Sequence, residues 1–395
     1  MCNFFLLVIF VFLTFSCQRK SVHIDNEKNI YEFSLERALI QKHSIQLSMI
    51  GNEIEYIPLE TKRESVLSMF TMISISDHYI FVTDRRDIHQ FNRDGNHVRK
   101  IGSRGRGPGE FQDQIIRGIN VNDILNQLIV VEHYTHVFNF DGKHIKQFRN
   151  DTLGNLERVL PWNNNQFIYY YTNLPKYMNP NEYSLIVLNE YGEFIKSFKN
   201  YHKRIQERTY SFFNFAPFYL FQNVIRFKEF GVDTLYIIQN EKFIPYAIFD
   251  LGNRAMPTDI YIPDFSRTDE VFGRYQGKHW LVNIVEDNDN FYLFFHNGIG
   301  LSLRGISQKS TSKTLILENN AFQNDIDGGL PFFPKYVYND SILVDWIDAF
   351  DLREHVLNSN VAEMRRLYGQ KFDDLLKLAN SLDDESNPIL VIVKK

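Results

Sequence analysis

Short apolar runs, each followed by a polar turn, recur along the chain and predict strands rather than helices. The runs that begin at Tyr79, Gln127 and Phe167 are rich in β-branched and aromatic residues, which favour pleated, half-buried strands. Each run precedes a turn that contains glycine, a residue that adopts the positive φ of a tight hairpin without strain. The three turns lie at Gly95, Gly142 and Gly192. Each unit is therefore predicted to be a strand, a loop, a strand, a turn and a further strand.

These turns repeat with a nearly constant period, which is the feature that decides the fold class. Between the glycines of successive turns the chain advances by 47 and then by 50 residues. Weaker copies of the unit begin at Asp233, Asn290 and Asp340, so the chain holds about six units. Units of this size are typical of propeller blades. The sequence thus predicts an all-β, six-bladed β-propeller over residues 51–395.

The two ends of the predicted ring are expected to meet in one sheet, because a closed ring leaves no unpaired edge. The C-terminal segment NPILVIVKK, which starts at Asn387, has the composition of a last strand. The segment EIEYIPLE, which starts at Glu53, is its expected partner. Ring closure by an N-terminal and a C-terminal strand is therefore predicted.

One segment near the C-terminus breaks the strand pattern. Residues 361–382 place apolar side chains such as Leu367, Phe372 and Leu375 at helical spacing among charges. We interpret the segment as a helical insertion in the last blade that buries its apolar stripe on its own domain. The alternative is a helix that docks a partner.

An apolar run from Phe4 to Leu13 is too short to span a bilayer but has the length of a signal-peptide core. The run continues into LTFSC, which resembles a bacterial lipobox because a small residue precedes the cysteine. Residues 1–16 are therefore predicted to be a lipoprotein signal peptide. Lipid on Cys17 would tether the protein to a membrane, and residues 17–50 would form a tether and leading segment. The alternative is a plain secretory peptide with an incidental cysteine.

Cysteine usage and charge exclude several function classes. The only cysteines are Cys2 and Cys17, so the mature body is predicted to have no disulfide, no cysteine-ligated zinc and no cysteine nucleophile. The formal net charge of −5 gives no basic surface of the kind that nucleic-acid binding requires. Nucleic acid is therefore not an expected partner.

Three segments together resemble a known family. They are IEYIPLET from Ile54, YIFVTDRRDIHQFNRDG from Tyr79 and IGSRGRGPGEF from Ile101. Their order resembles the six-bladed β-propeller lipoproteins of Bacteroidota, and the last two segments are similar to NHL repeats. The resemblance implies the propeller fold and a cell-envelope location, and it implies no catalytic residues. Because the residues after Cys17 lack the acidic cluster that resembles a surface-export tag in such lipoproteins, we expect the periplasmic side of the outer membrane.

The segment IGSRGRGPGEF, residues 101–111, has two interpretations. As a nucleotide-binding loop it lacks the G-x-G-x-x-G spacing, a following helix and the Gly-Lys-Ser/Thr of a Walker loop. As a corner between two blades, its glycines supply φ values that are closed to other residues, and Pro108 stiffens the turn. The corner is the favoured interpretation.

This corner and the neighbouring loops are predicted to place charged and aromatic side chains at one mouth of the central channel. Arginine forks suit carboxylates and phosphates. The predicted ligand is therefore an anionic glycan, a peptide terminus or a lipid headgroup, and the alternative is a set of solvated loop charges without a ligand. The candidate ligand-binding residues are Arg85, Arg86, Arg104, Arg106, Glu132, His133 and Tyr134.

The sequence contains no motif that indicates catalysis, a cofactor or a metal. His133 and His136 are three residues apart, and on a strand such side chains point to opposite faces, so no metal site is predicted. Neither a G-x-S-x-G elbow nor a calcium loop is present. The predicted function is an envelope-anchored binding or interaction module for a glycan, a peptide or an envelope protein. The alternatives are a propeller lyase or hydrolase acting on a glycan or lactone, and a structural partner of an outer-membrane complex.

Overall fold

The structure, a computed structural model, consists mainly of β-strands. It describes residues 30–70, 72–84, 86–113, 115–149, 156–163, 165–171, 183–199, 217–229, 231–257, 273, 275–297 and 302–395. The chain divides into two units, of which Tyr31–Lys395 contains the sheets. The predicted signal peptide, Cys17 and Arg85 lie outside the described residues.

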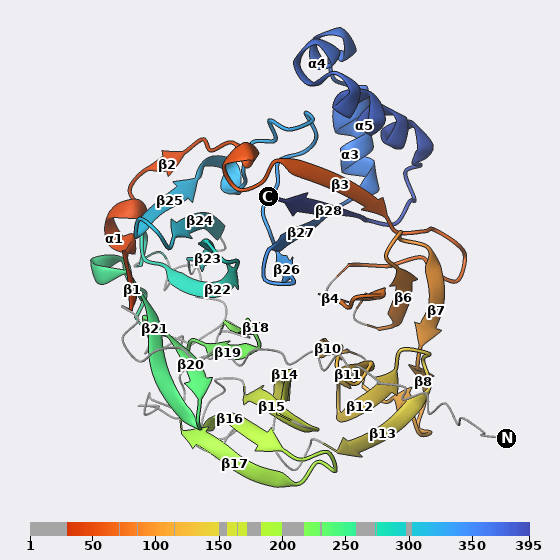
Figure 1. The fold of residues 1–395 in the computed structure, drawn as a ribbon, viewed down its shortest axis with the longest axis vertical. Coiled ribbons are helices and arrows are strands. Elements are labelled where there is room, and N and C mark those ends of the chain that lie inside the picture. Colours follow the sequence, from red (N-terminus) through yellow and green to blue (C-terminus); the bar gives the residue numbers. More distant parts are fainter. Residues whose placement is uncertain are drawn as a thin grey trace, which may run out of the picture. The chain divides into compact units, whose positions relative to one another are not determined.

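Six sheets of four or five strands form a ring in the part of the chain that the structure describes (Figure 1). Each sheet is a blade. Blade 1 consists of β4 (Met72–Ile75), β5 (Tyr79–Thr83), β6 (Ile88–Asn92) and β7 (His97–Ile101). Blade 2 consists of β10 (Gly118–Asn122), β11 (Gln127–Val131), β12 (Tyr134–Asn139) and β13 (His144–Arg149). Blade 3 consists of β14 (Leu156–Trp162), β15 (Gln166–Tyr171), β16 (Tyr183–Leu188) and β17 (Phe194–Lys199).

The second half of the ring follows the same plan. Blade 4 consists of β18 (Phe218–Phe221), β19 (Val224–Phe227), β20 (Thr234–Gln239) and β21 (Lys242–Asp250). Blade 5 consists of β22 (Trp280–Glu286), β23 (Asn290–His296), β24 (Ser302–Gln308) and β25 (Lys313–Leu317). Blade 6 consists of β26 (Tyr336–Tyr338), β27 (Ile342–Ile347), β28 (Ile389–Lys394) and β3 (Glu53–Pro58).

Successive strands of a blade pair antiparallel, and the first strand of each blade lies nearest the centre of the ring (Figure 1). Neighbouring blades share buried apolar clusters, as where Phe81 of blade 1 packs with Leu128 and Phe138 of blade 2. This arrangement is a six-bladed β-propeller, so the predicted fold class is confirmed. Ring closure is confirmed as well, because β28 pairs antiparallel with β3 and places Leu390 opposite Ile57.

Because successive strands run antiparallel, the connections alternate between the two faces of the ring. We call the face with the first and third turns of each blade the turn face. The loop face carries the second connection of each blade and the corners between blades. The three predicted glycine turns have φ between 79° and 86°. Blade 4 makes the equivalent turn with Asn240 and Glu241 at φ of 48° and 65°, so the sequence repeat weakens there although the turn persists.

An N-terminal strap, residues 31–50, runs along the outer edges of blades 4 and 5 (Figure 1). Its strands β1 (Tyr31–Ser34) and β2 (Lys42–His43) pair in parallel with β21 and β25. They are joined by the short helix α1 (Leu35–Ala38), and the 3-10 helix η1 (Leu47–Met49) leads on to β3. Buried side chains of the strap include Phe33, Leu35 and Leu47. The strap therefore covers two sheet edges within the segment that the sequence assigns to the tether and leading residues 17–50.

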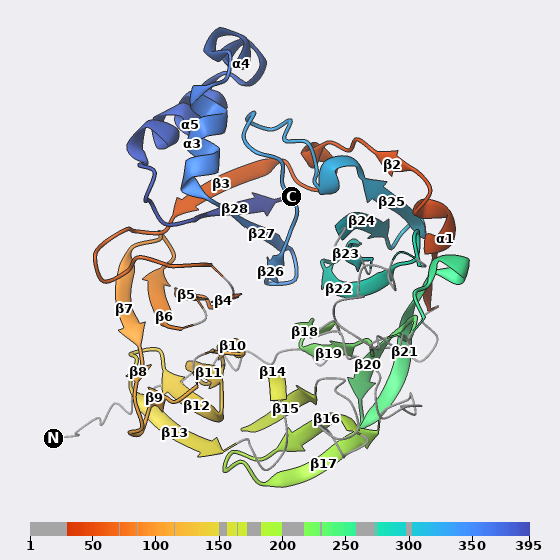
Figure 2. The ribbon, with the colours of Figure 1, turned by 180° about the vertical axis from the view of Figure 1, so that it is seen from behind.

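Three helices form the insertion between β27 and β28, on the loop face: α3 (Ala349–Leu357), α4 (Val361–Tyr368) and α5 (Gln370–Ser381). The predicted segment 361–382 covers α4 and α5, which Gly369 separates at φ 58°. Helix α3 was missed because the apolar run of β27 continues into it. Phe372 and Leu375 of α5 are buried with Leu352 of α3, whereas no residue of α4 is buried. Figures 1 and 2 both show α4 on the outer side of α5.

Three shorter elements complete the fold. The strands β8 (Ser103–Arg104) and β9 (Glu110–Phe111) form a small parallel pair between blades 1 and 2. The 3-10 helices η3 (Gly252–Arg254) and η5 (Glu318–Asn320) follow β21 and β25. No helix in the described ranges is both long enough and apolar enough to span a bilayer.

Candidate functional site

The glycine-rich segment 101–111 forms the corner that joins the outer strand of blade 1 to blade 2, as the favoured interpretation of the sequence expects. Gly102 and Gly109 have φ of 67° and 79°. Side chains at either position would collide, Gly102 with the Phe111 ring and Gly109 with His144. The N–H of Gly107 donates to Glu110 Oε2 at 2.7 Å, so the loop binds a carboxylate of its own.

The described arginines of the predicted site lie on this corner and the loop beside it. Arg104 in β8 donates through Nη2 to the backbone oxygen of Arg86, and Arg86, Arg104 and Arg106 are exposed. Figures 1 and 2 both place β8 on the outer side of the ring, next to β7 and β13. The structure therefore brings Arg86 and Arg104 together on the loop face, toward its outer rim.

The acidic and aromatic members of the predicted site lie in blade 2. The Glu132 side chain is buried and its Oε1 accepts a hydrogen bond from His136 Nε2 at 2.9 Å. Its Oε2 accepts from the backbone N–H of Asp113 at 2.6 Å. These hydrogen bonds outweigh burial and lower the pKa of Glu132 to about 2. His133 and Tyr134 pack edge to face with ring centroids 5.4 Å apart. Glu132 is thus held inside blade 2 by His136.

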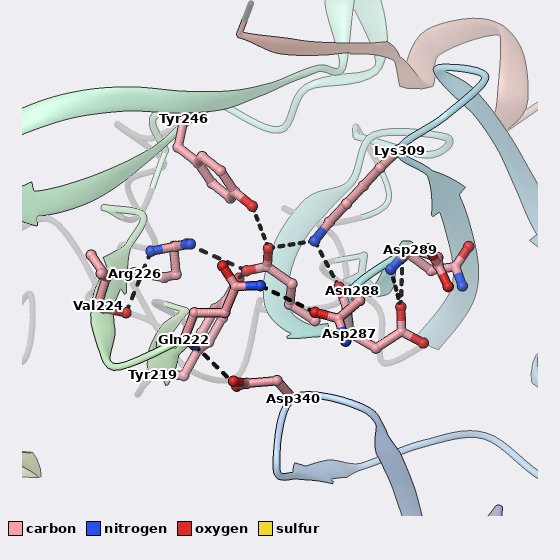
Figure 3. A network of polar contacts seen from close by, with 12 residues as sticks. Tyr219, Gln222, Val224, Arg226, Tyr246, Asp287, Asn288, Asp289, Lys309 and Asp340 are labelled. Carbon is pink, nitrogen blue, oxygen red and sulfur yellow. Dashed lines mark hydrogen bonds and ion pairs between the residues drawn. The ribbon is translucent and has the colours of Figure 1, made fainter. Parts of the chain in front are cut away.

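A second polar centre, which the sequence did not indicate, lies between blades 4 and 5. The side chain of Glu286 is wholly buried, and its Oε1 accepts from Lys309 Nζ at 2.8 Å and from the Tyr246 hydroxyl at 2.7 Å. Its Oε2 accepts from the Tyr219 hydroxyl at 2.8 Å and lies 3.5 Å from Arg226 Nε. Figure 3 shows Arg226, Lys309 and Tyr246 directed toward this carboxylate. We call these five residues the blade 4–5 ion cluster.

Aromatic rings surround the two cations of the cluster. The Arg226 guanidinium lies 4.2 Å from the centroid of Tyr246, and Lys309 Nζ lies 4.5 Å from that of Phe221. Such contacts favour a cation electrostatically. Burial lowers the pKa of Lys309, and the Glu286 carboxylate opposes that change. Burial and Glu286 raise the pKa of Tyr219, so its hydroxyl keeps the proton that it donates.

The ion cluster also fixes the first turn of blade 5. Lys309 Nζ donates to the backbone oxygen of Asp287 at 2.6 Å. Asp287 Oδ1 accepts from the backbone N–H groups of Asp289 and Asn290 at 2.7 and 2.6 Å, and its Oδ2 accepts from the Tyr292 hydroxyl at 3.0 Å. An aspartate that binds the backbone two residues on stabilises a turn. The turn is therefore stabilised both by the hydrogen bonds of Asp287 within blade 5 and by Lys309 of the ion cluster.

A pocket of about 340 Å³ adjoins this turn on the turn face. It lies at the seam between blades 5 and 6, where Asn52 N donates to Lys394 O at 2.9 Å. Gln308 and Ser310 flank Lys309, whose side chain enters the ion cluster while its neighbours line the pocket. We call this space the seam pocket, and its lining residues are Ser48, Met49, Ile50, Gly51, Asn52, Asp289, Asn290, Gln308, Ser310 and Lys395.

The seam pocket is polar, and the charged side chains that line it are paired with each other. Lys395 Nζ pairs with Asp289 and lies 3.5 Å from Asp287 Oδ2. Asn52 and Ser310 are exposed at its opening, whereas Asn290 is 6% exposed. Hydroxyl and amide groups can both donate and accept hydrogen bonds. The pocket therefore suits a ligand with many hydroxyl or amide groups rather than a strongly charged one.

Turns of three successive blades meet beside the ion cluster. The backbone N–H of Gln222 in blade 4 donates to Asp340 Oδ1 of blade 6 at 3.0 Å. The Gln222 side chain donates to Asn288 Oδ1 of blade 5 at 3.1 Å, as Figure 3 shows. Hydrogen bonds thus link blades 4, 5 and 6 on the turn face near the centre of the ring, next to the blade 5 turn that lines the seam pocket.

Sequence reasoning missed this centre because its residues come from distant segments. A partial signal was Arg226, a charge within the apolar strand VIRF. Charges are rarely buried unless they are paired, so such a position indicates an internal ion pair. Among the residues with described placement, no three His, Cys, Asp or Glu side chains converge on a point that would hold a metal ion.

Lys228, on the loop face of blade 4, is a further buried cation and is 3% exposed. Burial lowers its pKa to about 8, and the neighbouring Asp233 and Glu229 carboxylates limit the change. No ion pair of Lys228 with another described residue lies within bonding distance. Its charged form is therefore destabilised in the folded protein.

We expect the free energy of unfolding to rise with pH between about 8 and 10.5, by about 3 kcal/mol. The pKa of Lys228 is lower in the folded protein than in the unfolded chain, so between these pH values the unfolded chain binds more protons. A rise in pH removes those protons and therefore increases the free energy of unfolding. Lys228→Met should remove the rise and make the protein more stable at pH 7. Urea unfolding from pH 7 to 10.5 measures both effects, and an unchanged slope in the variant would contradict the expectation.

Comparisons with known proteins agree with the fold. A family model described as a domain of unknown function (DUF4934) matches residues 30–394. A crystal structure from Bacteroides fragilis, whose name describes it as an exported protein, has a TM-score of 0.67 at 16% identity. The similarity covers 93% of this chain and 100% of that one. None of the curated proteins matches the sequence significantly.

Two further solved structures are more distant. Virginiamycin B lyase of Staphylococcus aureus has a TM-score of 0.39 at 11% identity, over 69% of this chain and 77% of the lyase. A protein of unknown function from Bacteroides caccae has a TM-score of 0.37 at 9% identity, over 63% of this chain and 82% of that one. Similarities at this level carry no functional argument.

Proposed function

We propose that this chain, which belongs to the DUF4934 family, is an exported β-propeller that binds a glycan in the seam pocket. The proposal includes a lipid at Cys17 and a place on the periplasmic side of the outer membrane. The B. fragilis structure, named as an exported protein, supports the envelope location. The proposed function is ligand binding in the seam pocket, whose walls are formed by turns of the closed ring.

The lining of the seam pocket is the observation that carries the proposal. Its volume of about 340 Å³ lies in the range of small-molecule sites, which is about 300–1,000 Å³. The amides of Asn52, Asn290 and Gln308 suit the hydroxyls of a sugar, and Met49 offers an apolar contact for a sugar face. Asp289 and Lys395 offset each other, so a neutral glycan fits better than the anionic ligand that the sequence predicted.

The pocket is preorganised by the groups behind it. The wall formed by Asp289 and Asn290 is fixed through Asp287, and Asp287 is fixed by Lys309 and Tyr292. A wall that does not rearrange costs a ligand less ordering on binding. The buried ion cluster thus has a function in the proposal, because it holds the binding surface in place.

A glycan array probed with the tagless mature protein tests the proposal. We expect binding to neutral glycans, loss of binding in Ser310→Trp, which fills the pocket from an exposed position, and retention in Ser302→Trp, an exposed serine at the other end of β24. Arg104→Glu should have no effect. Binding to anionic glycans that Arg104→Glu abolishes and Ser310→Trp leaves intact would move the site to the arginine corner and overturn the proposal.

The lipid tether has a separate test. Cys17→Ala should leave the protein unlipidated, and the protein should move from the membrane fraction to the soluble fraction of the envelope. Fractionation of cells that express each form, with metabolic labelling by a fatty-acid analogue, measures this. Membrane association and labelling that survive the substitution would contradict the predicted lipoprotein.

A further inference from the structure

Histidine pairs occupy the same positions in blades 1 and 2. His89 in β6 and His97 at the start of β7 correspond to His136 in β12 and His144 at the start of β13. Each member of the second pair lies 47 residues after its counterpart, which is also the spacing between Gly95 and Gly142. The ring centroids are 5.5 Å apart in blade 1 and 5.9 Å apart in blade 2.

In blade 1 the facing nitrogens of the two histidine rings can form a hydrogen bond with each other. His97 makes a backbone hydrogen bond with Arg99, and its Nε2 lies 3.5 Å from His89 Nδ1. A neutral imidazole has one N–H and one lone pair, so His89 Nδ1–H can donate to His97 Nε2. Both facing nitrogens then have a partner.

Blade 2 differs because Glu132 Oε1 accepts a hydrogen bond from Nε2 of the buried His136 ring. When the ring is neutral, Nδ1 carries a lone pair and cannot donate to its neighbour. His144 makes a backbone hydrogen bond with Lys146, which leaves a lone pair on Nε2 as well. His136 Nδ1 and His144 Nε2 are both buried, and neither has a hydrogen-bond partner among the described residues.

Two buried lone pairs on neighbouring rings are costly unless a cation satisfies them. Imidazole nitrogens are preferred ligands of zinc, copper and nickel ions. Ligating histidines usually donate their second N–H to a carboxylate or a backbone carbonyl, which is the arrangement that Glu132 and Lys146 provide. The hydrogen bonds of the two rings with Glu132 and with the backbone of Lys146 therefore orient both rings as they would be oriented around a metal.

We propose that His136 Nδ1 and His144 Nε2 bind a divalent transition-metal ion such as Zn²⁺ in blade 2, with Glu132 as the positioning carboxylate. Two nitrogens at zinc distances of about 2.0–2.1 Å in a tetrahedral site lie about 3.3–3.4 Å apart. The equivalent nitrogens of blade 1 lie 3.5 Å apart. The ring centroids of blade 2 are 5.9 Å apart, against 5.5 Å in blade 1, so the blade 2 rings close slightly when they bind the ion. No third protein ligand converges in the described ranges, and water completes the coordination.

The site was not predicted, because the only histidine pair considered as metal ligands was His133 and His136, which are close in sequence. The structure instead pairs His136 with His144 across two adjacent strands, β12 and β13. His144 is half-buried, and the backbone of Gly109 lies against its ring. The recurrence of two histidines at the repeat period was the signal that could have indicated the pair.

Equilibrium dialysis of the tagless, metal-stripped mature protein against Zn²⁺ tests the proposal. We expect one ion per chain, lost in His144→Gln and retained in His97→Gln, the matched change in blade 1. Glu132→Gln should weaken Zn²⁺ binding about 10–100-fold, because the carboxylate no longer fixes the ring. Circular dichroism confirms that each variant is folded.

A spectroscopic measurement on the unchanged protein makes the test independent of the variants. With one equivalent of Cu²⁺, electron paramagnetic resonance should show coupling to two imidazole nitrogens. The proposal is overturned if the parent protein binds no Zn²⁺, if His97→Gln removes binding as His144→Gln does, or if bound Cu²⁺ shows no nitrogen coupling. None of these outcomes depends on whether the seam pocket binds a glycan.

Discussion

Glu286→Gln is expected to lower the free energy of unfolding by about 3–5 kcal/mol, the usual cost of breaking a buried ion pair from one side. Glu286 is the only described carboxylate within 4 Å of Arg226 and Lys309, which are 2% and 6% exposed in their side chains. Removing its charge leaves two buried cations facing each other. Because net stabilities are about 5–15 kcal/mol, the variant should lose a large share of its stability.

Urea unfolding followed by tryptophan fluorescence measures the Glu286 effect. The matched control is Glu241→Gln, which removes the exposed partner of Lys196 and should change the free energy of unfolding by less than about 1 kcal/mol. If the two variants are equally stable, the ion cluster does not hold blades 4 and 5 together as described.

Removal of the N-terminal strap is expected to abolish stable folding. A chain that begins at Asn52 keeps β3 but lacks five core side chains, each worth about 1.5–3 kcal/mol when buried. Their sum, about 10 kcal/mol, equals the net stability of a typical domain. The deletion also uncovers the outer edges of β21 and β25, which favours aggregation. The five are Phe33, Leu35, Ile45, Leu47 and Ile50.

Size-exclusion chromatography and limited proteolysis measure the result of the strap deletion. A chain that begins at Ile30, where the family match starts, is the control and should be a protease-resistant monomer. If the chain from Asn52 is equally soluble and unfolds cooperatively, the propeller begins at residue 51, as the sequence predicted, and the strap is an accessory.

Much of the ring was predictable because its local chemistry repeats. Glycine turns and alternating strands identify blades 1 to 3, and the terminal strands β3 and β28 have clear apolar patterns. The strap was not predictable, because β2 has two residues and a strand added in parallel at an edge leaves no periodic signal. Pairing of such segments is decided by distant partners rather than by their own sequence.

The candidate sites were predictable only in part. The corner at residues 101–111 is positioned by glycine conformation and was identified from sequence, and Arg86 and Arg104 do lie together. Burial of Glu132 was not foreseen, since its partner His136 points back from the next strand. The seam pocket combines three distant parts of the chain, so only the closed ring brings its residues together.

In the proposed function, the seam pocket binds the ligand of this propeller. Isothermal titration of the strongest array glycan against the parent protein, Ser310→Trp and Ser302→Trp tests it directly. We predict one binding site in the parent protein and in Ser302→Trp, and no measurable heat of binding in Ser310→Trp. Equal affinity of the parent protein and Ser310→Trp would contradict the claim.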